Sequence, residues 1–586
     1  MFFLIIILLL PFSSLMGSDY YDVQIKGNAP ESLIDTVKSN SQLFLSKEIP
    51  VNNESALRQR AAADLPNLMA ILHNSALFNA KIDFEFNFSN HPWLVMIHIE
   101  TGPVYSLKDF HIHPPGEQPL PLLEEIPLKE LGIILDQPAY LKNILAAEEL
   151  LIKRMAASGY PLAKIVNKEV IADQSAHTIS AILYLDSGPL ARYGDTTITG
   201  LSKVDESVVR KKIAWNKGDT YNPCLLEQTQ AALEASGLFS SISISHSDQL
   251  SDGEVFLPIV IDVAEARHRS IGWGLAYNTE RGPGVTAEWE HRNFRERGER
   301  LRFNTTLWER TQDISLIYVT PDYLRPKQDL LWIAECHRDK TRGFTESSFS
   351  LSRIIERQWS EETKISYGMM YKALRDTRSE PKGDYSLFKT PLHLRWSNAN
   401  SLLDPTRGAT VNLRITPSAQ LIKHPFIYSI NTLVTSFYLP LSQDARYVLA
   451  SKVTLGSILG SSRRLIPASE RFYEGTESTL RGYRYLTVSP LNEDYKPIGG
   501  RSMMIYSGEL RVRASDSIGW ALFYEIGNVY SSILPRFDKK LLQSAGFGIR
   551  YHTLAGPLRF DIAFPLTPRR HIDKAFQVYL SIGQAF

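Results

Sequence analysis

The chain ends in Phe576-Gln577-Val578-Tyr579-Leu580-Ser581-Ile582-Gly583-Gln584-Ala585-Phe586, a stretch in which apolar residues alternate with small or polar ones. Successive side chains of a strand point to opposite sides, so the pattern predicts a strand with two unlike faces. One face carries Phe576, Val578, Leu580, Ile582 and Phe586, with Gln584 as its polar exception. Such a strand fits the wall of a transmembrane barrel, and it also fits the last strand of a soluble sheet.

The same alternation recurs throughout residues 266–586. It appears at 271–278, 409–416, 509–514 and 558–564, where apolar side chains alternate with glycine, polar or charged ones. About two thirds of the aromatic residues also lie in this half, including seven of the nine tryptophans. Aromatic enrichment beside alternating strands is typical of the two interfacial girdles of a membrane barrel. A large soluble β-sandwich remains the alternative on these features alone.

The amino-terminal half contains a degenerate repeat. The stretch 74–82 recurs at 157–165 and again at 235–242, each time after a helical pattern and before strand patterns. Gly159 and Gly237 stand where a helix would end, because glycine readily adopts the left-handed conformation that stops a helix. A strand–helix–helix–strand–strand order accounts for the spacing. We therefore expect three small α+β units at residues 19–102, 103–188 and 189–265, followed by an all-β domain at 266–586.

The first residues predict export. An apolar run at residues 2–10 is too short to span a bilayer as a helix, which needs ~20 residues, and it fits the core of a signal peptide spanning 1–18. The formal net charge of +1 argues against a nucleic-acid partner. Two cysteines, Cys224 and Cys336, exclude a disulfide scaffold and are interpreted as unpaired.

A long stretch near the end of the chain carries the family resemblance. Residues 467–475 read PASERFYEG and lead into STLRGYRY at 478–485. This resembles the sixth extracellular loop of the BamA/TamA outer-membrane assembly superfamily, whose Arg-Gly-Tyr tip, here Arg481, Gly482 and Tyr483, folds back into the barrel lumen. The final phenylalanine also resembles the carboxy-terminal signal of bacterial outer-membrane barrels.

The resemblance assigns partners to the loop tip. Phe523-Tyr524-Glu525, Gly548-Ile549-Arg550 and the segment 556–561 resemble the late-strand motifs that receive the loop, so Glu525, Arg550 and Asp561 are the expected lock partners. By alternation all three point to the lumen. The family usually has aspartate where this chain has Glu525, which makes Asp561 the safer partner.

Fold and function then follow as expectations from the resemblance. It implies periplasmic POTRA domains and a barrel of 16 antiparallel strands in the bacterial outer membrane. Three units favour a TamA-like member that inserts or exports barrel and autotransporter clients, beside a TamB-like partner and in contact with outer-membrane lipid. No cofactor and no metal are implied. The alternatives are a general BamA-like insertase, a two-partner-secretion transporter, a passive porin and an enzyme; the sequence lacks a Gly-x-Ser-x-Gly elbow and a His-Glu-x-x-His pair.

The seam between the first and last strands of the barrel is the second expected functional feature. Gly272 and Gly274 in the first strand, and Gly583 in the last, are expected to face inward. Glycine weakens a strand, because ordering it costs more entropy and it offers no side chain to pack. Related barrels open at this seam, so we expect lateral opening here, although glycines can also simply relieve crowding in a barrel.

Overall fold

The computed structural model describes residues 20–582, except for 90, 116–125, 248–254, 279–281, 378–381, 423, 538–539 and 554–555, and it also describes residues 584 and 585. The expected signal peptide, Gly583 and Phe586 lie outside the described residues. The chain divides into two compact units: residues 200–212, 232–242 and 263–586 form one, and the rest of the amino-terminal half belongs to the other.

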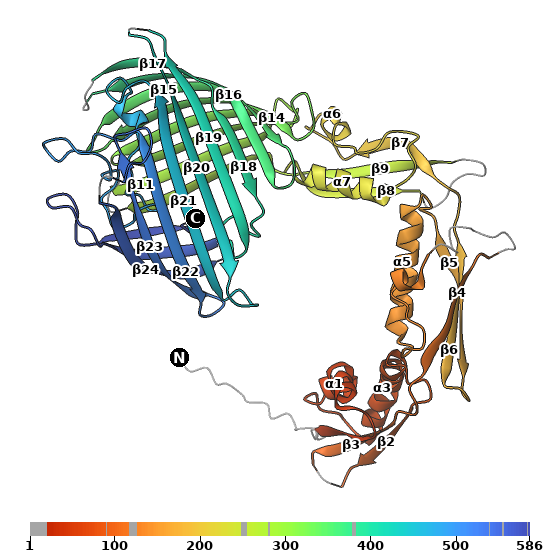
Figure 1. Ribbon diagram of the computed structural model, residues 1–586. Coiled ribbons are helices and arrows are strands. Elements are labelled where there is room, and N and C mark those ends of the chain that lie inside the picture. Colours follow the sequence, from red (N-terminus) through yellow and green to blue (C-terminus); the bar gives the residue numbers. More distant parts are fainter. Residues whose placement is uncertain are drawn as a thin grey trace, which may run out of the picture. The chain divides into compact units, whose positions relative to one another are not determined.

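Three small three-stranded sheets make up the amino-terminal half (Figure 1). Each central strand runs parallel to the first strand of its sheet, as in β1–β3 and β4–β6. In spatial order the sheets are β1 (Tyr21–Gly27), β3 (Trp93–Glu100) and β2 (Lys81–Asn87); β4 (Ser106–His113), β6 (Thr178–Asp186) and β5 (Lys164–Asp173); and β7 (Arg192–Thr199), β9 (Phe256–Glu265) and β8 (Phe239–His246).

Helices accompany each sheet and bury its apolar face. They are α1 (Glu31–Asn40), α2 (Gln42–Leu45) and α3 (Glu54–Asn74) in the first unit; η1 (Leu128–Leu131) and α5 (Leu141–Ala157) in the second; and α6 (Glu206–Arg210) and α7 (Pro223–Glu234) in the third. In the first core, Leu68 and Leu72 of α3 share a buried cluster with Val95 and Ile97 of β3. The alternating residues of β3 thus supply one side of a core whose other side is a helical stripe.

The turns after the longest helices explain the repeat. Ala76, Gly159 and Gly237 occupy equivalent positions and have φ of 63°, 96° and 66°. Each ends a helix by adopting the left-handed conformation, which glycine accepts at least cost. The expected role of Gly159 and Gly237 is therefore observed, and the first unit makes the same turn with an alanine.

The carboxy-terminal half is one curled antiparallel sheet (Figure 1). Its two edge strands, β10 and β26, lie close to each other. Its strands, in sequence and spatial order, are β10 (Arg269–Asn278), β11 (Gly282–Phe294), β12 (Glu299–Trp308), β13 (Thr311–Thr320), β14 (Gln328–Lys340), β15 (Thr345–Gln358), β16 (Thr363–Asp376), β17 (Gly383–Lys389), β18 (Leu392–Ser397), β19 (Gly408–Gln420), β20 (Phe426–Pro440), β21 (Tyr447–Gly460), β22 (Ser502–Arg513), β23 (Ile518–Tyr530), β24 (Leu542–Thr553), β25 (Gly556–Pro565) and β26 (Gln577–Ile582).

One strand position is interrupted. Both β17 and β18 pair with β16 on one side and with β19 on the other, so together they fill a single place. The break falls at Pro391, which has no backbone N–H to donate to the ladder. Seventeen segments therefore make 16 strand positions, and the predicted fold class, α+β repeats followed by a 16-stranded barrel, is confirmed.

The two faces of the sheet differ as the alternation predicted. In β25, Leu558 and Phe560 are 40% and 41% exposed, whereas Arg559 and Asp561 are buried. In β23, Trp520 and Leu522 point outward while Glu525 is fully buried on the inner face. Apolar residues thus lie on the outer face of the barrel and charged residues on its inner face.

The end of the last strand departs from the predicted alternation. Phe576 and Leu580 are exposed on the outer face, as expected, while Tyr579 is buried. Gln584 was expected on the outer face, but its Oε1 accepts a hydrogen bond of 2.9 Å from Nε of Arg550, which is buried inside. That expectation is wrong because β26 ends at Ile582, and strict alternation holds only within a strand.

In the described part of the chain, no helix is both long and apolar enough to cross a bilayer.

Candidate functional site

The connection between β21 and β22, residues 461–501, folds inward and is largely buried. It contains the short 3-10 helix η2 (Ala468–Glu470) and then forms an irregular hairpin, in which Phe472 pairs with Gly500 and Glu474 with Val488. Leu480 and Val488 belong to a buried cluster with residues of the barrel wall. We call this segment the lumen loop.

Arg481 lies at the tip of the lumen loop and has no exposed surface. Its backbone N–H donates to Oε2 of Glu525 at 2.5 Å, and its Nε donates to Oε1 of the same carboxylate at 3.0 Å. Its Nη1 donates to Oδ2 of Asp561 at 2.8 Å and to Oε2 of Glu509 at 3.1 Å. One guanidinium therefore connects three strands, β22, β23 and β25, through charge-assisted hydrogen bonds.

The same carboxylates are shared with further arginines of the wall. Arg550 donates to Oδ1 of Asp561 at 2.5 Å and to Oε1 of Glu509 at 3.4 Å. Arg511 also donates to Oε1 of Glu509, at 2.9 Å. The structure thus brings Arg481, Glu525, Arg550 and Asp561 together, and it adds Glu509, which the sequence analysis did not select. Its inward position was visible in the alternation of 509–514, but nothing in that pattern named its partner.

Gly482 and Tyr483 fix the tip in different ways. Gly482 has φ of 95°, and a Cβ there would lie 3.1 Å from backbone atoms of Phe564 and Pro565, so the loop needs glycine to approach β25. Its N–H donates to the hydroxyl oxygen of Tyr579 in β26 at 3.0 Å. The buried Tyr483 donates its hydroxyl to the carbonyl of Gln543 at 2.8 Å.

A second anchor lies at the start of the loop, and sequence reasoning missed it. Glu470 in η2 accepts hydrogen bonds from Lys389 of β17 and, at 3.0 Å, from Lys372 of β16. Lys372 also lies 2.8 Å from Oε1 of Glu346. Burial alone would raise the pKa of Glu470, but Lys389 and Lys372 outweigh it and lower that pKa to about 2. The ionised carboxylate of Glu470 therefore anchors the lumen loop to β16 and β17, and Arg481 anchors it to β22, β23 and β25.

Glu474 lies between the two anchors, and its pKa is shifted in the opposite direction from that of Glu470. It is buried, it accepts the Thr479 hydroxyl, and burial raises its pKa to about 7. The charge of Lys452 in β21 acts against this rise of the pKa, and its Nζ donates to the carbonyl of Ser478 at 2.5 Å. This carboxyl is the group of the lumen loop whose charge can change near neutral pH.

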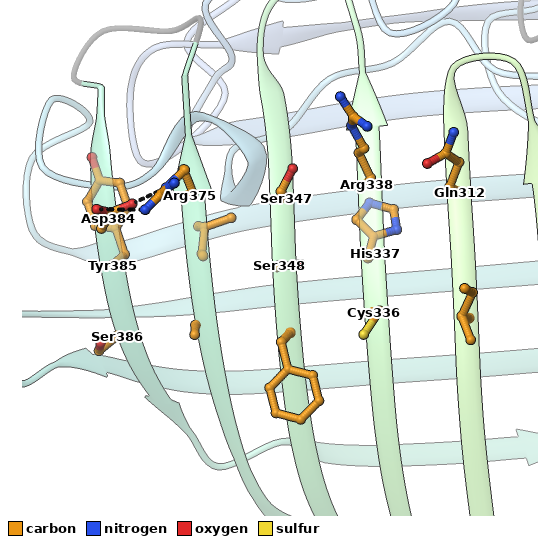
Figure 2. Close-up of a pocket in the computed structure, with 14 residues that line it drawn as sticks. Gln312, Cys336, His337, Arg338, Ser347, Ser348, Arg375, Asp384, Tyr385 and Ser386 are labelled. Atoms are coloured by element: carbon orange, nitrogen blue, oxygen red, sulfur yellow. Dashed lines mark hydrogen bonds and ion pairs between the residues drawn. The ribbon is translucent and has the colours of Figure 1, made fainter.

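Two other features of the barrel could serve as sites. A depression of about 610 Å³ over β13–β17 lies mainly on the outward face (Figure 2), where Arg375 and Asp384 are paired at 2.7 Å. Within the described residues, Asp313, Glu335 and His337 place their ligand atoms within 4.8 Å of one another and could hold a metal ion. Because His337 is already hydrogen-bonded to Asp313, an ion pair accounts for their proximity. The expectation of no metal therefore stays a prediction.

The seam residues lie on a strand with an unusually open edge. In β10, Ile271, Trp273 and Leu275 are 80%, 79% and 74% exposed, and among the described residues β11 is the one strand that pairs with β10. In the described parts of the two strands, β10 and β26 do not form a hydrogen-bonded pair. Gly272 and Gly274 alternate with these outward residues. Both cysteines are free, as predicted, and both are exposed.

The chain matches known proteins along most of its length. Residues 293–586 match the Omp85 superfamily domain, and residues 191–266 match the POTRA model, a surface antigen variable number repeat. BamA of Nitratidesulfovibrio vulgaris is 32% identical over 145 residues, which make up 24% of this chain and 18% of that protein. BamA of Neisseria meningitidis is 20% identical over 495 residues, 74% of this chain and 61% of that protein. The chain thus spans about three fifths of the length of the Neisseria relative and less of the other.

A solved structure has the same fold. BamA from Haemophilus ducreyi lacking POTRA domains 1–3 aligns with a TM-score of 0.71 at 18% identity, over 81% of this chain and 99% of that one. The described architecture is an amino-terminal series of POTRA-like sheets, then a barrel with an inward-folded loop. The chain belongs to the Omp85 superfamily. It is a bacterial outer-membrane protein with periplasmic POTRA domains; the relatives are BamA proteins, so membership of the TamA-like subgroup is not shown.

Proposed function

We propose that this protein assembles β-barrel clients into the outer membrane as a general BamA-like insertase. The observation that carries the proposal is the open edge of β10 beside a last strand that is tied to the lumen loop by the Gly482–Tyr579 hydrogen bond. A strand edge without a ladder partner presents free N–H and C=O groups to an incoming strand. A client strand can therefore pair with β10 by β-augmentation, which requires no fixed client sequence.

Gly272 supports opening at this place. A Cβ at Gly272 would meet no atom within 4 Å, so the inner side of the strand is unpacked there. Few side-chain contacts are lost if β26 moves away from β10. Gly583, the third glycine proposed for the seam, is outside the described residues, as is the terminal Phe586 of the proposed carboxy-terminal barrel signal.

The small sheets offer a place to receive clients before insertion. In the second unit, β5 is an edge strand that pairs with β6 in the described structure, and Val166, Val170 and Ile171 along it are 44–55% exposed. An unfolded client segment can extend such a sheet through backbone hydrogen bonds. We propose strand capture by the POTRA domains as the first step, and the domain limits 19–102, 103–188, 189–265 and 266–586 as the working division.

A narrower, TamA-like role is the second candidate. Three POTRA-like sheets in the described chain favour it, and it would add autotransporter clients and a TamB-like partner in the periplasm. Co-purification of a periplasm-spanning partner with the full chain, together with selective loss of autotransporters after depletion, would support this role. Loss of all barrel proteins would support the general insertase. A passive channel is disfavoured by the buried charge network in the lumen.

A cross-linking experiment tests the seam. In a background lacking Cys224 and Cys336, one cysteine is placed at 271–275 in β10 and one at 577–581 in β26, and pairs that form a disulfide are reconstituted into liposomes. We expect the oxidised protein to stop inserting an unfolded barrel client and the reduced protein to insert it. The matched control is Ala287→Cys with Thr305→Cys, which joins β11 and β12, two strands that are already paired. Equal insertion by the oxidised and reduced seam variants would contradict lateral opening.

A further inference from the structure

A pocket of about 1030 Å³ lies at the periplasmic end of β10 and β11, where the third POTRA unit meets the barrel within one compact unit. Four side chains that line it are cationic and two are acidic, so its lining carries a positive excess. The two imidazoles add further donors. The charged and imidazole residues are Lys203, Arg267, Arg269 and Arg295, with Glu265, Glu296, His268 and His291.

The pocket has a fixed wall. Oε1 of Glu265 accepts the backbone N–H groups of Ser202, Lys203 and Val204 at 2.7, 2.8 and 2.9 Å. Asn293 holds the same turn from the barrel side, because its Nδ2 donates to the carbonyl of Lys203 at 2.9 Å. The carboxylate of Glu265 is thus engaged in hydrogen bonds that hold this wall of the pocket.

Two of the four cations that line the pocket are arginines without an ion-pair partner in the described structure. In the described residues, Arg267 and Arg269 make no ion pair or hydrogen bond with their side chains, whereas Arg292 on the inner face of β11 pairs with Glu290 at 3.0 Å. The side chain of His268 is 10% exposed, and its buried Nε2 has no hydrogen-bond partner. Its nearest carboxylate, that of Glu265, is 3.8 Å away. A buried imidazole nitrogen without a hydrogen bond, beside two unpaired arginines, favours an anionic ligand at this place.

The position of the pocket identifies the source of the anion. Arg269 lies opposite His291, and the next outward pair along the same strands is Ile271 and Trp289. Since residues two apart share a face, both pocket residues lie on the lipid-facing side, about 7 Å below an apolar pair. Phe294 and Tyr318, which flank Arg295 at 5.9 and 5.8 Å, add aromatic rings at the same end. Aromatic residues and arginines together are typical of the headgroup level of a membrane.

We propose that this pocket binds the phosphate headgroup of an anionic phospholipid in the periplasmic leaflet of the membrane. Arg267 and Arg269 neutralise the phosphate, the backbone turn 202–204 and Asn293 shape the cavity, and His268 donates from Nε2. The bound lipid lies directly below the first strand of the barrel. The proposal is independent of which clients the protein inserts.

Native mass spectrometry of the full chain tests the site. The protein is released from micelles that contain equal amounts of phosphatidylglycerol and phosphatidylcholine with the same acyl chains. We expect preferential retention of phosphatidylglycerol, and a loss of roughly fivefold in affinity for each arginine replaced in Arg267→Gln and Arg269→Gln, because one basic residue near an anionic surface contributes ~1 kcal/mol. The control Arg353→Gln removes another exposed outward arginine, which stacks on Trp332, and should leave retention unchanged.

A second measurement uses the unmodified protein. Hydrogen exchange at residues 202–204 should slow in nanodiscs containing phosphatidylglycerol relative to phosphatidylcholine alone. Equal retention by the wild type and the double arginine variant, or equal exchange in both membranes, would overturn the proposal. Protection by inorganic phosphate without retention of phosphatidylglycerol would overturn the lipid assignment and leave a site for a free anion.

Discussion

The backbone N–H of Gly482 donates a hydrogen bond of 3.0 Å to the hydroxyl oxygen of Tyr579, residues that are 97 positions apart in the chain. This bond connects the tip of the lumen loop to the last strand, which is one edge of the proposed seam. Arg550 adds a second connection to the same end, through Gln584. The state of the loop and the position of β26 are therefore physically coupled.

Replacing Tyr579 by phenylalanine should weaken this coupling. The change removes one acceptor and leaves the Gly482 N–H buried without a partner, at a cost of about 1–3 kcal/mol. We expect an inserted barrel whose loop is cut faster by protease added from outside. Tyr524→Phe is the matched control, since its ring is 39% exposed on the outer face of β23. Equal cleavage of the two variants would show that the bond does not hold the loop.

The lysine variant of Arg481 tests whether charge alone secures the loop. Lys keeps the charge but cannot contact Glu525, Glu509 and Asp561 together, because an ammonium lacks the planar fork of guanidinium. Breaking a buried charge pair costs on the order of 3–5 kcal/mol, so we expect client assembly to fall while the barrel remains inserted. Arg446→Lys, at an exposed pair with Asp444, is the control. Assembly at the wild-type rate by Arg481→Lys would refute the need for bidentate contacts.

The strand pattern explains how much of this site was predictable. Inward facing of Glu525, Arg550 and Asp561 follows from alternation, and the loop motif pointed to Arg481. The partners of Glu470 could not be found in the same way, since Lys389 and Lys372 precede it by 81 and 98 residues and only the closure of the sheet brings them together. Gln584 was misplaced because the pattern does not show where a strand ends.

Glu474 should make the lumen loop sensitive to pH. Its folded pKa of about 7 lies above the ordinary value of 4.5, so the loop binds the proton more tightly than the detached state does. The proton on Glu474 therefore stabilises the folded loop fully below pH 4.5. This stabilisation falls by on the order of 3 kcal/mol as pH rises from 4.5 to 7. We expect protease to cut the loop faster at pH 8 than at pH 5, after correction for protease activity. Glu474→Gln should abolish this difference; an unchanged difference would exclude Glu474 as its source.

The repeated helix stop allows a paired test in the POTRA units. Gly159→Ala places a side chain at φ of 96° and 2.7 Å from Cδ1 of Leu190, so we expect a loss of at least about 1–2 kcal/mol and faster hydrogen exchange in α5. Ala76→Gly at the equivalent turn relieves the same backbone strain and should slow exchange in α3 or leave it unchanged. Faster exchange in α3 of Ala76→Gly, or unchanged exchange in α5 of Gly159→Ala, would argue against a shared left-handed turn.

Gly548→Ala should disturb the charge network without removing any charged group. A Cβ at Gly548 would lie 2.0 Å from Oδ1 of Asp561 and 2.5 Å from Nη1 of Arg550, so the carboxylate must move away from the position in which it also receives Arg481. The backbone of the strand cannot easily yield, because Phe560 O is only 2.7 Å from the same point. We expect slower client assembly and a loop that protease reaches more easily, with the barrel still inserted. Gly508→Ala is the matched control, since its Cβ would lie 3.2 Å from the hydroxyl oxygen of Tyr506, at the end of an exposed side chain. If Gly548→Ala assembles clients as well as Gly508→Ala does, the position of Asp561 does not limit the activity, and the anchoring of the loop must depend on Glu525 and Glu509 instead.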